Sequence, residues 1–476
     1  MMALGYRGAM SIVCGWRDEG MIKFQIRRFG AKGTAMPATS VLVVAVVVTL
    51  AGLAVLSAYQ PEVSLLLGVG LPVGLGLIAW PEVTLGLYAN AGLFKADPRL
   101  RALAGLADMT LMLGIILIAA LVYRLVLRRE RIGWTREMSL ALIFAGVILL
   151  GILYTPASAY GMDKALRFVS LTMLAFFTPL VIMTSRRAVT RFFFGWLGIA
   201  MLLTADALSR LGSGQRLSGF NATSIAVSRT VGVAVLVLVF TVLMGRVART
   251  WRILAVGGLV LMTLVLLGSG ARGPFLSLGI VVALATGIAS GRPGRRARSL
   301  LIIGILGLAI LGVLWSGLVP TASIQRFNLL MSQADRDTSS QARLMVMRDA
   351  WQLFVSSPVI GRGIGSVSAF GAGREQVYPH NILLELAAET GVLGLGLYLV
   401  LVGLVLLRLL SKLSTASDHD ALWLTLFATF LFTFLNAMVS GDLNDNRDLW
   451  LFAGVAIAAT EIEGGSTRHG REGERR

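Results

Sequence analysis

The four residues Tyr-Pro-His-Asn at positions 378–381 hold one of the three histidines in this chain. Two carboxylates, Glu385 and Glu389, follow within ten residues of His380. A histidine that titrates near neutral pH, beside carboxylates and outside a membrane, can accept a proton from an attacking hydroxyl. The alternative is a structural histidine that ties a loop to a neighbouring helix. The pattern therefore makes His380 a candidate general base.

Several cations outside the predicted cytoplasmic segments could bind an anion. Arg272 lies in a tight Gly/Ser-rich break between two apolar runs, Arg216 precedes another run, and Lys164 and Arg167 lie in a short polar stretch. A guanidinium offers a planar pair of donors to phosphate oxygens. The alternative is that each side chain reaches the lipid headgroups. Because these cations share the predicted side of His380, we expect an anion site near it.

A helix is expected to position the histidine. Proline favours the first helical position and glycine the end of a helix, so the pattern predicts a helix from Pro379 to Gly391. His380 and Asn381 would then lie in its first turn. Asn381, Glu385 and Glu389, spaced four apart, would share one face.

The polar stretch that precedes this helix, residues 318–389, is the longest hydrophilic interruption of the chain. Ser339 and Ser340 can cap a helix that Pro358 would end. Its apolar face is predicted to hold Leu344, Met347, Trp351, Phe354 and Val355, and to lie on the bilayer or pack over the spans. The Gly-Arg-Gly-Ile-Gly sequence at 361–365 lacks the strand and Lys-Ser/Thr of a phosphate loop, so a tight turn is expected there.

Composition indicates a helical membrane protein. Of 476 residues, 56% are hydrophobic and 14% are charged, and this balance excludes a soluble protein. The formal charge of +18 comes from short basic clusters between apolar runs, which favours membrane topology over nucleic-acid binding. One cysteine, Cys14, and three histidines give no pattern typical of a metal site.

The fold class expected from these runs is all-α, a polytopic membrane protein of about 12–14 transmembrane helices with one large periplasmic loop. The excess of Lys and Arg in alternate segments places both termini in the cytoplasm and the long loop outside. The predicted spans are 40–57, 63–79, 82–95, 104–123, 139–155, 166–184, 192–208, 224–244, 253–269, 274–290, 299–317, 390–410, 421–440 and 448–463. The predicted regions are a cytoplasmic tail (1–39), a transmembrane bundle (40–317), a periplasmic catalytic loop (318–389), C-terminal spans (390–463) and a second cytoplasmic tail (464–476).

Several of these segments resemble the O-antigen ligase and O-antigen polymerase superfamily. The resemblance covers roughly residues 150–400, through the block 378–394, the loop 343–365, the Ser-Gly-Ala-Arg-Gly sequence at 269–273 and the stretch 160–168. It implies a multi-pass protein of the bacterial inner membrane that transfers a glycan from undecaprenyl diphosphate to an acceptor hydroxyl. No nucleotide sugar, cofactor or metal is expected.

The resemblance also implies roles for single residues. His380 would activate or orient the acceptor hydroxyl, and Arg272 with Arg216 would hold the diphosphate and stabilise the leaving group. Arg343 and Lys164 are further candidates for that anion site. Asn381 and Glu385 are candidate substrate-binding residues in the signature block.

Two enzymes and one transporter remain open as functions. A ligase would use lipid A–core as acceptor, whereas a polymerase would extend O-antigen or exopolysaccharide repeats on a second lipid-linked glycan. A transporter or flippase would need ionisable residues deep inside spans, for which Asp108, Asp206 and Arg229 are the candidates. Membrane lipids are partners in every case, and the sequence leaves the oligomeric state undetermined.

Overall fold

The computed structural model describes residues 71–100, 108–130, 132–245, 247–291, 293–332, 338–370, 378–415 and 421–473. The chain divides into two compact units, residues 1–75 and 76–476, and the first is described only from Leu71, where α3 (Leu71–Ala79) begins. The predicted tail 1–39 and span 40–57 lie outside the described residues.

Every regular element in the described part of the chain is helical, and nine helices there are long and apolar enough to cross a membrane. The chain is therefore an all-α, multi-pass membrane protein, as the composition predicts. The nine helical runs are Met109–Leu127 (α7, η2), Arg136–Leu153 (α8, η3), Ser158–Ile182 (α9, η4, α10), Arg186–Leu208 (α11), Ser224–Leu243 (α12, η5), Arg249–Ser269 (α13), Arg272–Ser290 (α14), Arg296–Trp315 (within α15, Pro293–Trp315) and Ile382–Thr415 (α19). Beside them are a shorter apolar helix, α20 (Ala421–Ala437), and α21 (Arg447–Gly473).

The predicted span 82–95 is instead two short helices, α4 (Pro81–Ala89) and α5 (Ala91–Lys95), separated at Asn90. The Asn90 side chain stabilises this break, since its amide donates to the Gly86 carbonyl and its oxygen accepts from the Thr230 hydroxyl. Such a side chain competes with the helix for backbone partners.

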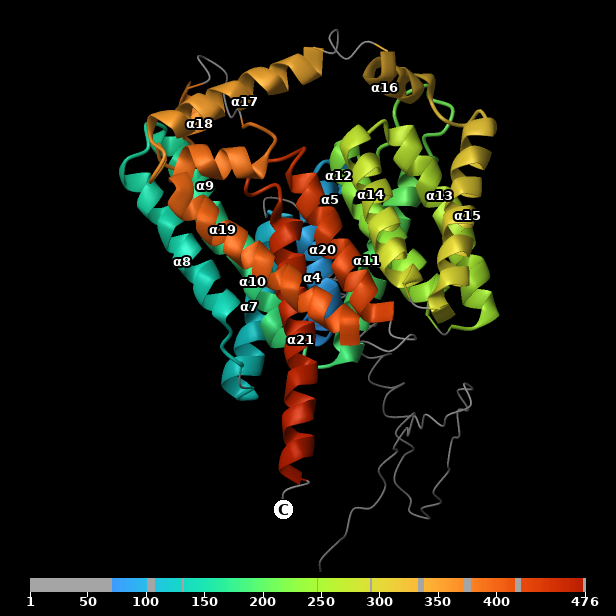
Figure 1. Ribbon diagram of the computed structural model, residues 1–476, viewed down its shortest axis with the longest axis horizontal. Helices are drawn as coiled ribbons and strands as arrows, with labels where there is room; N and C mark the ends of the chain where they lie inside the picture. Colours follow the sequence, from blue (N-terminus) through green and yellow to red (C-terminus); the bar gives the residue numbers. More distant parts are fainter. Residues whose placement is uncertain are drawn as a thin grey trace, which may run out of the picture. The chain divides into compact units, whose positions relative to one another are not determined.

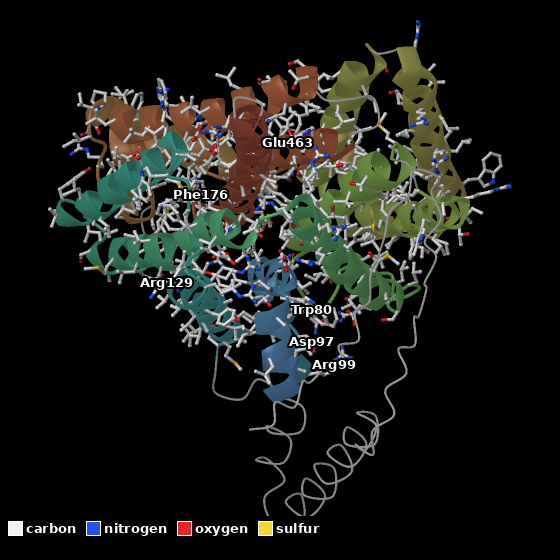
Figure 2. All side chains as sticks on the ribbon, turned by 90° about the horizontal axis from the view of Figure 1, so that it is seen from below. Trp80, Asp97, Arg99, Arg129, Phe176 and Glu463 are labelled. Atoms are coloured by element: carbon white, nitrogen blue, oxygen red, sulfur yellow. The ribbon has the colours of Figure 1, made fainter. Side chains whose placement is uncertain are left out.

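Two residues past α5, an ion pair fixes the chain (Figure 2). Arg99 donates to the Asp97 carboxylate at 2.8 Å, and it also lies 3.4 Å from the Asp206 carboxylate on α11. Asp206 in turn accepts from the Phe220 backbone N–H at 2.6 Å. Asp206 thus joins α11 to two loops.

The long polar segment forms α16 (Thr321–Ser332), α17 (Thr338–Ser356) and α18 (Ser366–Phe370), and α16 and α17 lie at the same end of the helices (Figure 1). The predicted helix is confirmed as α17, and of the two placements predicted for its apolar face, packing over the spans is not the one observed. Val346, Ala350 and Leu353 are buried against the first turns of α19, whereas Leu344 and Trp351 are exposed. Both faces are apolar, and the small Ala350 allows the closer approach to α19.

α19 breaks where the sequence predicts, at Gly391, whose backbone (φ 64°, ψ −164°) is non-helical. Segment 358–365 lies in the break: the N–H groups of Arg362 and Gly363 donate to the Ala388 and Glu389 carbonyls at 2.9 and 3.0 Å. These bonds satisfy carbonyls that the break removes from the helical ladder. The tight turn predicted at 361–365 is confirmed by positive φ at all three of its glycines.

Aromatic side chains hold the centre of the bundle together. Trp450 on α21 stacks on Phe144 of α8 at 5.4 Å and meets Phe168 of η4 edge-on at 5.1 Å. Tyr398 of α19 and Phe176 of α10, the latter labelled in Figure 2, complete the cluster. Aromatic pairs at these separations stabilise beyond the area that they bury. The cluster fixes α21, and with it the polar turn that precedes α21.

Candidate functional site

The turn between α20 and α21, residues 438–446, is the point at which the candidate residues meet; we call it the α20–α21 connection. Asp442 organises it, because its side-chain oxygen accepts from the backbone N–H groups of Asn444 and Asp445 at 2.9 and 2.7 Å. The Asn446 amide donates to the carbonyls of Ser440 and Asp442. The connection is therefore a self-bonded turn with a fixed shape.

Arg229 of α12 holds this connection from the side. Its guanidinium donates to the carbonyl oxygens of Asn436, Ser440 and Asp445, at 3.2, 2.6 and 3.3 Å. A charged group inside a membrane bundle is expected to bond in this way to backbone carbonyls. Arg229 thereby brings a positive charge next to the residues that precede α19.

His380 lies one residue before the cap of α19. The predicted placement in the first helical turn is wrong, because α19 begins at Ile382 and Asn381 caps it, accepting from the N–H groups of Leu383 and Leu384. His380 adopts a left-handed backbone (φ 54°), a conformation that is uncommon for a residue other than glycine. Tyr378 packs edge-on against the imidazole, with ring centroids 4.6 Å apart.

The surroundings of His380 keep its imidazole neutral. Burial lowers the pKa of His380 from 6.5 to about 4, and the positive charges of Arg343 and Arg229 act in the same direction. Its Nδ1 is buried and makes no hydrogen bond to any described residue. A neutral imidazole with an unused nitrogen can accept or donate one proton.

Tyr378 links the histidine to the α20–α21 connection. Its hydroxyl donates to the Asp445 carboxylate. Burial is the main cause that raises the pKa of Tyr378, and the nearby negative charge of Asp445 adds to it. Burial, together with the neighbouring Asp442, raises the pKa of the Asp445 carboxyl. The phenol therefore stays protonated and holds the aromatic ring against His380.

The predicted cations Arg343 and Arg272 border the same connection. Arg343 of α17 donates to the Val439 carbonyl at 3.5 Å. Arg272 is the first residue of α14, and a Cβ on the next residue, Gly273, would lie 3.0 Å from the Val439 side chain. Val439 thus lies between the two arginine-bearing segments.

Arg216 lies beside the turn that leads into α14. Leu217, its neighbour in sequence, donates its N–H to the Gly268 carbonyl at 2.8 Å and packs its side chain on Gly268. The Ser269 hydroxyl joins this turn to Ser228 of α12 at 2.8 Å. The segments that carry Arg216 and Arg272 therefore meet at one turn.

Lys164 and Glu385 lie together in a separate, buried cluster. The Lys164 ammonium, 2% exposed, lies 2.8 and 2.7 Å from the two carboxylate oxygens of Glu389 and 2.5 Å from Glu385. Glu385 also accepts from the Leu443 N–H at 3.2 Å. Both carboxylates face the lysine, so in this arrangement its ammonium is engaged by protein groups. The substrate-binding roles of these residues and of Asn381, the cap of α19, stay predictions.

Sequence reasoning did not identify the α20–α21 connection as part of the site, although a polar run in the sequence marks it. Residues 441–448 read Gly-Asp-Leu-Asn-Asp-Asn-Arg-Asp, a dense polar run between two apolar stretches. Tyr378, Asp445 and Arg229 acquire their positions around His380 only through this run. Among the described residues, no three His, Cys, Asp or Glu side chains lie close enough to hold a metal ion.

Part of the chain is similar to a known protein family. Residues 257–399 match a protein-family model described as O-antigen ligase. The matched stretch includes Arg272, Arg343 and His380, whereas Lys164 and Arg216 lie outside it. A search of curated proteins found no match.

Proposed function

We propose that this multi-pass membrane protein transfers a lipid-linked glycan to an acceptor hydroxyl, because residues 257–399 match the O-antigen ligase family model. The donor is a glycan on undecaprenyl diphosphate, and the acceptor is a hydroxyl such as one of lipid A–core. The reaction takes place at the periplasmic face of the inner membrane. This orientation, with both termini in the cytoplasm, rests on the distribution of Lys and Arg.

One observation carries the proposal: a neutral, half-buried imidazole lies within the field of two guanidinium groups. The acceptor oxygen attacks the anomeric carbon, and the new glycosidic bond forms as the bond from that carbon to the diphosphate oxygen breaks. The electron pair leaves with undecaprenyl diphosphate, and His380 takes the hydroxyl proton. With a pKa of about 4, the imidazole is a weak base, which suits a proton that leaves late, once the new bond has made it acidic.

The arginines supply the charge that this reaction needs. As the sugar–oxygen bond breaks, negative charge develops on the diphosphate, and Arg272 with Arg216 and Arg343 would stabilise it. A bound diphosphate would also offset the positive field of Arg343 and Arg229 at His380. The imidazole would then become more basic when the donor is present.

Polymerisation of O-antigen or exopolysaccharide repeats uses the same chemistry with a different acceptor. The three candidate intramembrane charges give little support to a transporter or flippase, because each has a structural role. Asp108 caps α7 by accepting from Thr110 and Leu111 N–H groups, Asp206 joins loops, and Arg229 bonds to backbone carbonyls. Each of these groups thus has a structural partner.

The test is complementation of a deletion strain with wild type, His380→Ala and Arg272→Ala at matched membrane levels. We expect both variants to abolish surface polysaccharide, and Arg187→Ala, an exposed arginine at the start of α11, to retain it. Normal product from both site variants would refute the proposal. Long chains left on the carrier lipid in the deletion strain would identify a ligase, and single repeats would identify a polymerase.

A further inference from the structure

A cavity of about 670 Å³ lies beside the His380 site, and of the described cations that the sequence predicts for an anion site it contains Arg167 alone. Its walls come from α4 and α5, the start of α7, α9 and η4, α12 and the α20–α21 connection. Two of its residues reach the site: Asp445 accepts from Tyr378, and the charge of Arg229 acts on His380. The cavity and the site therefore share a wall.

The lining contains both carboxylates and cations. Three carboxylates, of Asp108, Asp445 and Asp448, line the cavity together with four cations, Lys95, Arg167, Arg229 and Arg447. Placing an apolar group against this many charged side chains is costly, so water or a polar ligand rather than a lipid tail is expected in the cavity.

Protein groups already engage these cations. Lys95 pairs with Asp108, Arg167 pairs with Asp163, and Arg229 donates to three carbonyls. Arg447 lies over the Tyr88 ring at 5.4 Å. Because these cations already have protein partners, the three carboxylates of the lining weaken its attraction for a phosphate. A neutral ligand rich in hydroxyls fits better, because it can donate to carboxylates and accept from arginines.

The uncharged part of the lining is both polar and apolar. Asn90, Thr110 and Asn444 carry amide and hydroxyl groups, whereas Leu93 and Leu111 are apolar. A sugar can exchange hydrogen bonds with the first group and place its C–H face on the second.

We propose that this cavity binds sugar residues of a substrate glycan, next to the atoms that react at His380. The proposal rests on the proposed function and adds to it the place where the saccharide is held. The volume lies in the range of small-molecule sites, roughly 300–1,000 Å³. The diphosphate belongs with Arg272, outside this cavity.

Gly92 of α5 provides the test. It lines the cavity, and a Cβ built on it meets nothing within 4 Å, so Gly92→Leu fills the space without disturbing the helix. Gly198 of α11 is the matched control, because it is also helical, also open at Cβ and absent from the cavity lining. Gly92→Ala adds a smaller group and favours the helix.

The probe is a lipid-free oligosaccharide released from the surface polysaccharide of the producing strain. Binding to the full-length protein in nanodiscs is followed by the rise in thermal unfolding temperature. We expect Gly92→Leu to raise the dissociation constant at least about tenfold, and Gly198→Leu and Gly92→Ala to change it little. The unfolding temperature without oligosaccharide shows whether each variant is folded.

Unchanged binding and activity in a folded Gly92→Leu, alongside an inactive His380→Ala, would overturn the cavity assignment and leave the glycan transferase standing. An active His380→Ala would instead refute the transferase mechanism. Tighter binding of inorganic diphosphate than of the oligosaccharide in wild type, lost in Gly92→Leu, would also overturn the assignment, because it would make the cavity an anion site.

Discussion

The Lys164 ammonium lies 2.8 and 2.7 Å from the two carboxylate oxygens of Glu389, although 225 positions separate the residues in the chain. Glu385, one turn earlier on α19, approaches the same ammonium at 2.5 Å. The cluster joins α9 to the short helical segment that follows His380. It therefore fixes the helix whose cap lies next to the candidate base.

Replacing Lys164 by Met would leave two buried carboxylates facing each other. We expect a loss of about 3–5 kcal/mol in folding free energy, the usual cost of removing one partner from a buried pair. The unfolding temperature of the purified protein in detergent measures it. Arg167→Met, on the same helix, breaks an ion pair to Asp163 with 61% and 50% exposed side chains, so its loss should be at most about 1 kcal/mol. Equal losses of stability in Lys164→Met and Arg167→Met would contradict the burial of Lys164.

Stability should depend on pH through His380. Its pKa is about 4 in the folded protein and near 6.5 in the unfolded chain, so the unfolded state takes up a proton first as the pH falls. The contribution of this group is complete above pH 6.5 and is lost between pH 6.5 and 4. Unfolding temperatures at pH 7 and 5 should differ less in His380→Gln than in wild type. The same decrease in both would show that other groups cause it.

The charge of Arg343 should influence the pKa of His380, the candidate base. Because this guanidinium lowers the pKa of His380, Arg343→Ala should move that pKa upward, toward 6.5. The acid side of the pH–activity profile, measured in membrane vesicles, should then shift to higher pH. Arg343→Lys keeps the charge and should leave the profile in place. An unshifted profile in Arg343→Ala would mean that another group controls the acid side.

Arg272 is expected to act on the leaving group. Arg272→Ala should lower the transfer rate by roughly 10²–10³, the loss typical of one donor to a developing oxyanion. Arg272→Lys retains the charge without the paired donors, so an intermediate rate is expected. Single-turnover transfer from a purified lipid-linked donor is the measurement, with Arg187→Ala as control. A transfer rate near that of wild type in Arg272→Ala would mean that other cations bind the diphosphate.

Gly363 is required by its conformation and by its neighbours. Its φ is +88°, and a Cβ would lie 2.6 Å from Thr155 Cα and 2.7 Å from the Gly151 carbonyl. Gly363→Ala should therefore destabilise the protein by more than about 1 kcal/mol. Gly198→Ala, in an open helical position, should be neutral or stabilising. The unfolding temperatures of both variants measure these effects. An unchanged unfolding temperature in Gly363→Ala would mean that the turn can adopt another conformation.

The sequence by itself determined the nine long apolar helices of the described residues, the helix over α17, the break at Gly391 and the glycine turn at 361–365. Each of these follows from a local property: the length of an apolar run, the preference of a capping residue, or the conformational freedom of glycine. His380 was identifiable on the same terms, through its residue type and its polar setting.

The tertiary structure decided which groups surround that histidine. Lys164, a candidate anion ligand by sequence, lies between two glutamates, while Tyr378, Asp445 and Arg229 gather around His380 through the α20–α21 connection. The break at Asn90 likewise depends on a hydroxyl 140 residues away. Hydropathy and backbone preference act over a few residues, whereas charge pairing acts through space, so only the packed helices establish these partners.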